Sequence, residues 1–129
     1  MLIVEDTADV RDILKEFLEA LGHEVTAAST GPDGLAMLQE LRPDVALIDA
    51  GLPGLDGYEL ARRVRAEPGG DQLYLVALTG YGGPDGKARA TSAGFDIQLT
   101  KPVDIHELSR VVSGSRMDRE EEAVLQPTR

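Results

Sequence analysis

Polar and charged side chains stand directly after several short apolar runs in this chain of 129 residues. In chain order they are Glu5, Asp6, Asp49, Thr79 and Lys101. The run before Asp49, Val45-Ala-Leu-Ile48, leads into a loop rich in glycine and proline. A continuous apolar run bounded by turn signals is typical of a strand covered on both faces, as in a parallel sheet. Such sheets bind ligands at the carboxyl ends of their strands, so we expect these side chains to share one cleft.

The chemistry of this set is that of a metal and a phosphoryl group. Three carboxylates in one cleft would repel one another, and burying them without a counter-charge would be costly. A divalent cation removes this problem. Mg²⁺ takes oxygen ligands and is usually held by one or two carboxylates, several waters and a phosphate. A lysine and a hydroxyl beside such a site suit the remaining oxygens of a phosphoryl group.

Helical patterns alternate with the apolar runs along the chain. The expected strands cover about 2–4, 24–28, 45–49, 73–78 and 97–99. The expected helices cover about 10–21, 32–41, 58–66, 84–93 and 105–112. Five strands alternating with five helices indicate right-handed crossovers and a parallel sheet with helices on both faces.

Helical spacing also predicts which side chains of these helices face the core. In the first helix the apolar residues are Val10, Ile13, Leu14, Phe17, Leu18 and Leu21. In the second helix the inner face is formed by Leu35, Leu38 and Leu41. In the third helix we expect solvent exposure for Arg62, Arg63 and Arg65. Either Thr7 or Asp9 can cap the first helix, and Gly22 ends it. The helix at 84–93 has few large apolar residues and should be the least firmly packed.

Net charge, composition and chain length limit the classes of protein that fit this sequence. The net charge is −10, with 23 acidic against 13 basic residues, which argues against nucleic-acid binding by this chain. No cysteine, membrane span or signal peptide is evident, which is compatible with a cytoplasmic location. We expect one domain over 1–113 and a charged, flexible tail over 114–129. Because the first strand begins almost at residue 1, we expect residues to be missing or the domain to come from a longer protein.

The ordered set of motifs resembles the receiver domain of two-component response regulators, over roughly residues 2–112. The matching motifs are Glu5-Asp6, Asp49 with its Gly-Leu-Pro-Gly-Leu-Asp-Gly loop, Thr79-Gly80 and Lys101-Pro102. Each motif alone is weak, but the set in this order and spacing is specific. The resemblance implies a flavodoxin-like, doubly wound five-stranded parallel sheet of order 2-1-3-4-5 with five helices. Thr79-Gly-Tyr-Gly and Gly94-Phe-Asp are most similar to receivers attached to hybrid sensor kinases.

The resemblance also implies a metal site. The implied Mg²⁺ ligands are Asp6, Asp49 and the backbone carbonyl of Gly51, with Glu5 acting through a water. It further implies that the Lys101-Pro102 peptide bond is cis.

Phosphoryl transfer follows from the same resemblance. Asp49 would attack a phosphohistidine of a sensor histidine kinase or a histidine phosphotransfer protein and become an acyl phosphate. Lys101 would neutralise the transferred group and Thr79 would hydrogen-bond one of its oxygens. The chain would then be a signalling switch that catalyses only its own phosphorylation and dephosphorylation, either alone or as part of a hybrid histidine kinase.

One departure and several alternatives remain open. Many receivers carry a tyrosine or phenylalanine three residues before the lysine, where this chain has Gln98, so switching by an inward-turning ring is ruled out. The main alternative is a phosphate-independent pseudo-receiver that serves as a protein interaction module. A phosphatase would need a carboxylate at Gly51, and a flavin-binding protein has only fold analogy in its favour. His23 and His106 are isolated and are not expected to be catalytic.

Overall fold

The sheet is parallel and doubly wound. The computed structural model describes residues 1–80 and 83–113. The predicted tail over 114–129, and Tyr81 and Gly82 of the predicted glycine-rich loop, lie outside the described residues. The strands in the described part are β1 (Leu2–Val4), β2 (Thr26–Ala28), β3 (Val45–Asp49), β4 (Tyr74–Thr79) and β5 (Ile97–Thr100). They pair in the order β2-β1-β3-β4-β5, which confirms the predicted topology.

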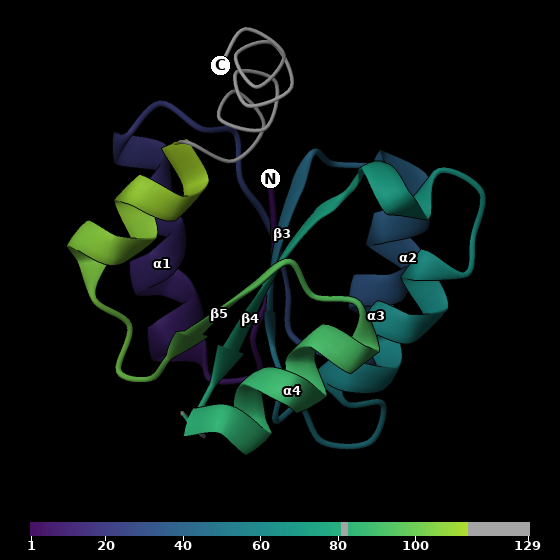
Figure 1. Cartoon of the computed structure of the whole chain (residues 1–129). Helices are drawn as coiled ribbons and strands as arrows, with labels where there is room; N and C mark the ends of the chain where they lie inside the picture. Colours follow the sequence, from purple (N-terminus) through teal and green to yellow (C-terminus); the bar gives the residue numbers. More distant parts are fainter. Residues whose placement is uncertain (81–82, 114–129) are drawn as a thin grey trace, which may run out of the picture.

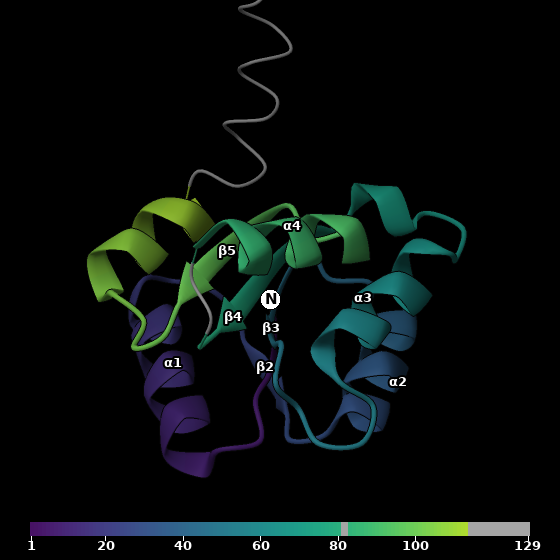
Figure 2. The same cartoon turned by 60° about the horizontal axis from the view of Figure 1, so that its bottom comes forward.

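Helices cover both faces of this sheet (Figure 1). They are α1 (Ala8–Ala20), α2 (Gly31–Leu41), α3 (Gly57–Arg65), α4 (Gly83–Ala93), the 3-10 turn η1 (Gly70–Gln72) and a last helix at 105–113. In Figure 1, α1 and the last helix lie on one side of the strands, and α2 and α3 lie on the other. Figure 2, turned to bring the bottom forward, shows α4 in front of β4 and β5, between the last helix and α3. The buried residues of α4, Ala90 and Ala93, belong to the same core layer as those of α2 and α3.

Two apolar layers, one on each face of the sheet, form the core. The layer under α1 and the last helix includes Ile3, Leu14, Leu18, Leu47, Val76, Leu78, Leu99 and Leu108. The layer under α2, α3 and α4 includes Leu2, Val4, Leu38, Ile48, Leu60, Val64, Leu75 and Phe95. Successive strand residues alternate between the layers, as the pleat requires. Every residue of β3 is buried, which confirms the expectation of a central strand.

Local sequence signals set the helix ends. The Thr30 side chain accepts a hydrogen bond from the Asp33 amide at 3.2 Å, and Asp56 accepts one from the Glu59 amide at 2.8 Å. Such caps satisfy backbone donors that the first helical turn leaves free. Thr7 occupies the N-cap position of α1, but its side chain makes no capping hydrogen bond.

The expectation that the apolar residues of the first and second helices all face the core is wrong at three positions. Leu21 and Leu41 lie at helix ends and are exposed. Helices of 13 and 11 residues are longer than the three-residue strands beneath them, so their ends overhang the sheet. Ile13 is exposed because it lies about 120° around α1 from the midpoint of the buried pair Leu14 and Leu18.

Arg65 is the fourth correction. It was expected in solvent with Arg62 and Arg63, yet its side chain is only 16% exposed. The reason is a set of backbone and carboxylate acceptors on neighbouring segments, described below. Within the described residues, no helix combines the length and the apolar character that crossing a membrane requires.

Candidate functional site

The carboxyl ends of the strands bring the predicted polar residues together. Glu5 and Asp6 follow β1, Asp49 ends β3, and Thr79 ends β4. Carboxylate oxygens of Glu5, Asp6 and Asp49 all lie within 4.8 Å of one another. Glu5 is fully buried and Asp49 is 6% exposed, whereas Asp6 is open to solvent. The cluster therefore has a buried floor and an accessible rim.

Lys101 reaches this cluster from the end of β5. Its Nζ lies 2.9 Å from Glu5 Oε1 and 3.2 Å from Asp49 Oδ2. Its backbone amide donates a hydrogen bond of 2.7 Å to the Thr79 carbonyl, which ties the ends of β4 and β5. The Lys101-Pro102 peptide bond is cis, as expected.

The Asp49 carboxylate is held at both oxygens. The Gly51 amide donates a hydrogen bond of 2.9 Å to Oδ1, while Oδ2 faces Lys101. The backbone of Asp49 is also tightly packed, because a Cβ built on Gly57 would stand 2.4 Å from the Asp49 carbonyl oxygen. The start of α3 thus fits against the strand end only because residue 57 has no side chain.

The pKa values of the two buried carboxyl groups, Glu5 and Asp49, are shifted in opposite directions. Burial, with the neighbouring Asp49, raises the pKa of Glu5 to about 7, although Lys101 opposes the shift. Burial also acts to raise the pKa of Asp49, but hydrogen bonds from Glu5 and the Gly51 amide and the charge of Lys101 outweigh it and lower that pKa. Burial acts to lower the pKa of Lys101, while its contacts with Glu5 and Asp49 raise it. Below about pH 7, Glu5 therefore holds a proton while Asp49 stays ionised.

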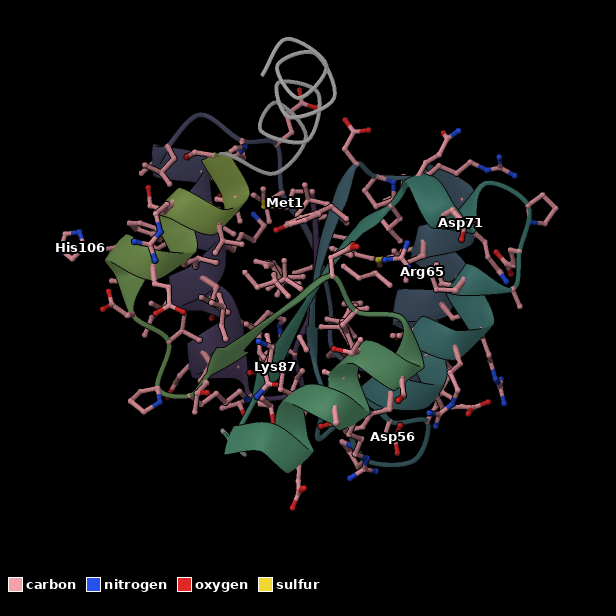
Figure 3. All side chains as sticks on the ribbon, in the orientation of Figure 1. Met1, Asp56, Arg65, Asp71, Lys87 and His106 are labelled. Carbon is pink, nitrogen blue, oxygen red and sulfur yellow. The ribbon has the colours of Figure 1, made fainter. Side chains whose placement is uncertain are left out.

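One contact in this region was not foreseen from the sequence. Arg11, one turn into α1, donates a hydrogen bond of 2.9 Å from its guanidinium to the Glu5 carbonyl. The Thr7 amide lies 3.4 Å from Glu5 Oε2. The only available signal was an arginine one helical turn after an acidic pair, which is too common to interpret alone. His106 is exposed and points outward from the last helix (Figure 3).

The donor set fits Mg²⁺. The cluster offers oxygen atoms only, and its accessible rim at Asp6 leaves room for the waters that Mg²⁺ retains. Sulfur and imidazole ligands, which zinc prefers, do not belong to this cluster. On the buried side of the cluster, the Lys101 ammonium group already neutralises part of the carboxylate charge.

Comparisons with known proteins agree with this geometry. The sequence model of the response regulator receiver domain matches residues 1–113. A 14.6 kDa protein of Leptolyngbya boryana is 40% identical over 112 residues, which are 87% of this chain and 86% of that protein. The structure of a CheY-like response regulator receiver domain protein from Methanospirillum hungatei has a TM-score of 0.82 and 31% identity, covering 94% of this chain and 95% of that one.

A second solved structure bears on the metal. The receiver domain of the sensor histidine kinase PA1611 from Pseudomonas aeruginosa holds a magnesium ion in its active site cleft. It has a TM-score of 0.80 and 31% identity, covering 87% of this chain and 92% of that one. Several other curated relatives are transcriptional regulatory proteins, and this chain spans 44–47% of their length.

Proposed function

Since the chain belongs to the response regulator receiver domain family, we propose that it accepts a phosphoryl group on Asp49 in a Mg²⁺-dependent reaction and changes conformation in response. The donor is a phosphohistidine on a sensor histidine kinase or a histidine phosphotransfer protein. The observation that carries the proposal is the state of Asp49, an almost buried carboxylate kept ionised beside Lys101 and an acidic cluster. Receiver domains in general are not enzymes in the usual sense, and we propose the same for this chain.

In the proposed transfer, different residues of the site bind the metal ion, attack phosphorus and contact the phosphoryl oxygens. Asp6, Asp49 and the Gly51 carbonyl would hold Mg²⁺, with Glu5 acting through a water, and the ion would neutralise phosphoryl charge. A carboxylate oxygen of Asp49 forms a bond to phosphorus while the bond from phosphorus to the donor imidazole nitrogen breaks, and the imidazole keeps the electron pair. Lys101 exchanges its contact with Asp49 Oδ2 for a contact with a phosphoryl oxygen. The Thr79 hydroxyl binds another phosphoryl oxygen.

The alternative of a phosphate-independent interaction module is disfavoured by the arrangement of the site. A module that signals without phosphate has no need of a buried glutamate, an ionised aspartate and a lysine within 3.2 Å of both. The named relatives include both a receiver of a sensor kinase and transcriptional regulators. We therefore define the partner by its chemistry, as a protein that presents a phosphohistidine, and place the receiver unit at residues 1–113.

Phosphorylation of the purified chain tests the proposal. With acetyl phosphate and Mg²⁺, intact-mass measurement should show one added phosphoryl group on the wild type and none on Asp49→Asn. Asp12→Asn is the matched control, because Asp12 is an exposed aspartate on α1 outside the cluster, and it should be labelled like the wild type. A phosphoryl group that persists in Asp49→Asn would place the acceptor elsewhere.

A further inference from the structure

The guanidinium of Arg65 joins the end of α3 to the segment that leads into β4 and to the turn between α4 and β5. Its Nε donates to the Gly94 carbonyl at 2.8 Å, and its Nη1 donates to the carbonyls of Gly70 at 2.5 Å and Leu73 at 2.7 Å. Its Nη2 donates to Asp96 Oδ2 at 2.8 Å. Figure 3 shows this side chain lying inside the molecule beside α3. A planar, permanently charged group with five donors suits such a junction, and a lysine could not copy it.

Asp96 extends the junction into the sheet. The Oδ2 atom that accepts from Arg65 also accepts a hydrogen bond of 2.8 Å from the Leu75 amide. The Asp96 amide in turn donates to the Leu75 carbonyl at 2.9 Å. One carboxylate and one guanidinium thus connect the end of α3, the start of β4 and the turn before β5.

The same junction holds the C-terminal end of α4. Gly94 has a φ of +108°, its amide donates to Thr91, and the Phe95 amide donates to the Ala90 carbonyl. This pattern closes the helix and leaves the Gly94 carbonyl for Arg65. The packing is close, since a Cβ on Gly94 would stand 2.7 Å from Arg65 Cγ. The end of α4 is therefore fixed by both hydrogen bonding and contact.

The remainder of α4 is weakly held. Among residues 85–93, only Ala90 and Ala93 are buried, and both lie in the C-terminal half. A further contact in that half is the Arg89 guanidinium, 4.1 Å from the centre of the Tyr58 ring on α3. The opposite end of α4 is the one that follows Thr79 and Gly80 in the chain. A helix held at one end and loosely packed at the other can tilt about the held end.

We propose that Arg65 is the pivot of α4: it keeps residues 94–97 in place while the N-terminal half of the helix swings when the site is phosphorylated. The inference rests on the proposed function, because phosphorylation of Asp49 supplies the stimulus. It adds that the response of α4 is stopped at the Arg65–Asp96 junction, before it reaches β5. Arg65 acts by positioning and does not touch the reacting atoms.

Amide hydrogen exchange of the full chain tests the pivot, with Mg²⁺ alone and with Mg²⁺ plus beryllofluoride. In the wild type, the phosphate mimic should change exchange at 85–90 and leave 94–97 unchanged. In Arg65→Lys, the change should extend to 94–97. The exchange rates of these amides should differ by at least about threefold between Mg²⁺ alone and Mg²⁺ plus beryllofluoride. Arg62→Lys is the matched control, because Arg62 lies on the same helix, is half exposed and pairs only with Glu59 among the contacts described. It should behave like the wild type.

The outcomes separate a pivot from a general stabilising contact. If Arg65→Lys speeds exchange at 94–97 by the same factor with and without beryllofluoride, Arg65 is structural and the pivot is wrong. A wild-type response at 94–97 as large as that at 85–90 also overturns it. If Arg65→Lys does not fold, Asp96→Asn can replace it, because it weakens the same junction. The exchange pattern expected for Asp96→Asn is the same as that for Arg65→Lys. Intact-mass phosphorylation of each variant shows whether a missing response instead reflects failure of Asp49 to react.

Discussion

At the scale of single residues, two carboxyl groups that share one cleft have opposite properties. Glu5 and Asp49 are both buried, yet the pKa of Glu5 is raised to about 7 and that of Asp49 is lowered. The difference comes from donors: hydrogen bonds from Glu5 and the Gly51 amide, together with Lys101, lower the pKa of Asp49, whereas burial dominates at Glu5. The environment thus keeps Asp49, the proposed nucleophile, ionised and leaves the charge of Glu5 sensitive to pH.

The raised pKa of Glu5 makes the stability of the metal-free protein fall as pH rises. Folded Glu5 retains a proton between about pH 4.5, its unfolded value, and about 7, so folding binds a proton in that window. Stability from this group is complete below the unfolded pKa and is lost as pH rises through the folded pKa, by at most about 3 kcal/mol. Mg²⁺ should offset the loss, because the cation favours ionised Glu5. Its stabilising effect should therefore be larger at about pH 8 than at about pH 6.

Urea unfolding of wild type and Glu5→Gln, with and without Mg²⁺ across this range, provides the measurement. Glu5→Gln should lack most of the pH-dependent loss. All other ionisable groups are common to the two proteins, so the difference between the curves isolates Glu5. Equal pH slopes in the two proteins would contradict the assignment of a raised pKa to this residue.

At the scale of elements, close approaches between backbones position the site. The first residue of α3, Gly57, lies against the backbone of Asp49, and the first residue of α2, Gly31, lies against Leu55. Both helices thereby brace the loop that follows β3. These approaches explain why glycines occupy helix positions where they otherwise weaken the helix.

Replacing Gly57 should therefore reverse the usual effect of a glycine-to-alanine change. In an ordinary helix position the change stabilises by about 0.5–1 kcal/mol. At Gly57 the new methyl would meet backbone atoms that cannot rotate away, so we expect a loss of about 1–3 kcal/mol. Gly80→Ala is the control, because a Cβ there meets nothing within 4 Å. Chemical denaturation measures both; an unchanged or higher stability of Gly57→Ala would refute the close-packing argument.

The helix boundaries show what a sequence can and cannot predict at this scale. Caps such as Thr30 and the helix-ending Gly22 act within a few residues, and their elements were located correctly. Burial was predicted less well, because the exposure of Leu41 depends on the length of a strand far away in the chain. Arg65 is the clearest failure. Its acceptors come from residues five to 31 positions away, and no local pattern identifies backbone carbonyls as partners.

At the scale of the whole molecule, the site was predictable because parallel topology is a strong constraint. Once apolar runs are assigned to parallel strands, the residues after them must meet at one edge, and Glu5, Asp49 and Lys101 do meet there. The pKa shifts were not predictable, since they depend on distances of about 3 Å between side chains 44 to 96 residues apart. The proposed path from the site through α4 was visible only in part: the few large apolar residues of α4 predict its loose packing, whereas the hydrogen bond from Arg65 to the Gly94 carbonyl at its end was not predictable from local sequence.

Thr79 is where that path should begin. It is buried at the end of β4, its carbonyl binds the Lys101 amide, and Gly80 connects it toward α4. A phosphoryl group can shift the molecule between two states only if it binds one of them better, and the Thr79 hydroxyl supplies such a difference if it moves toward the phosphoryl oxygen. Thr79→Ala should therefore leave Asp49 able to accept phosphate, because the carboxylate cluster and Lys101 are intact, but should abolish the exchange response at 85–90. Thr79→Ser keeps the hydroxyl and should restore that response. If the serine variant behaves like the alanine variant, the methyl group rather than the hydroxyl couples the site to α4, and the proposed path is wrong.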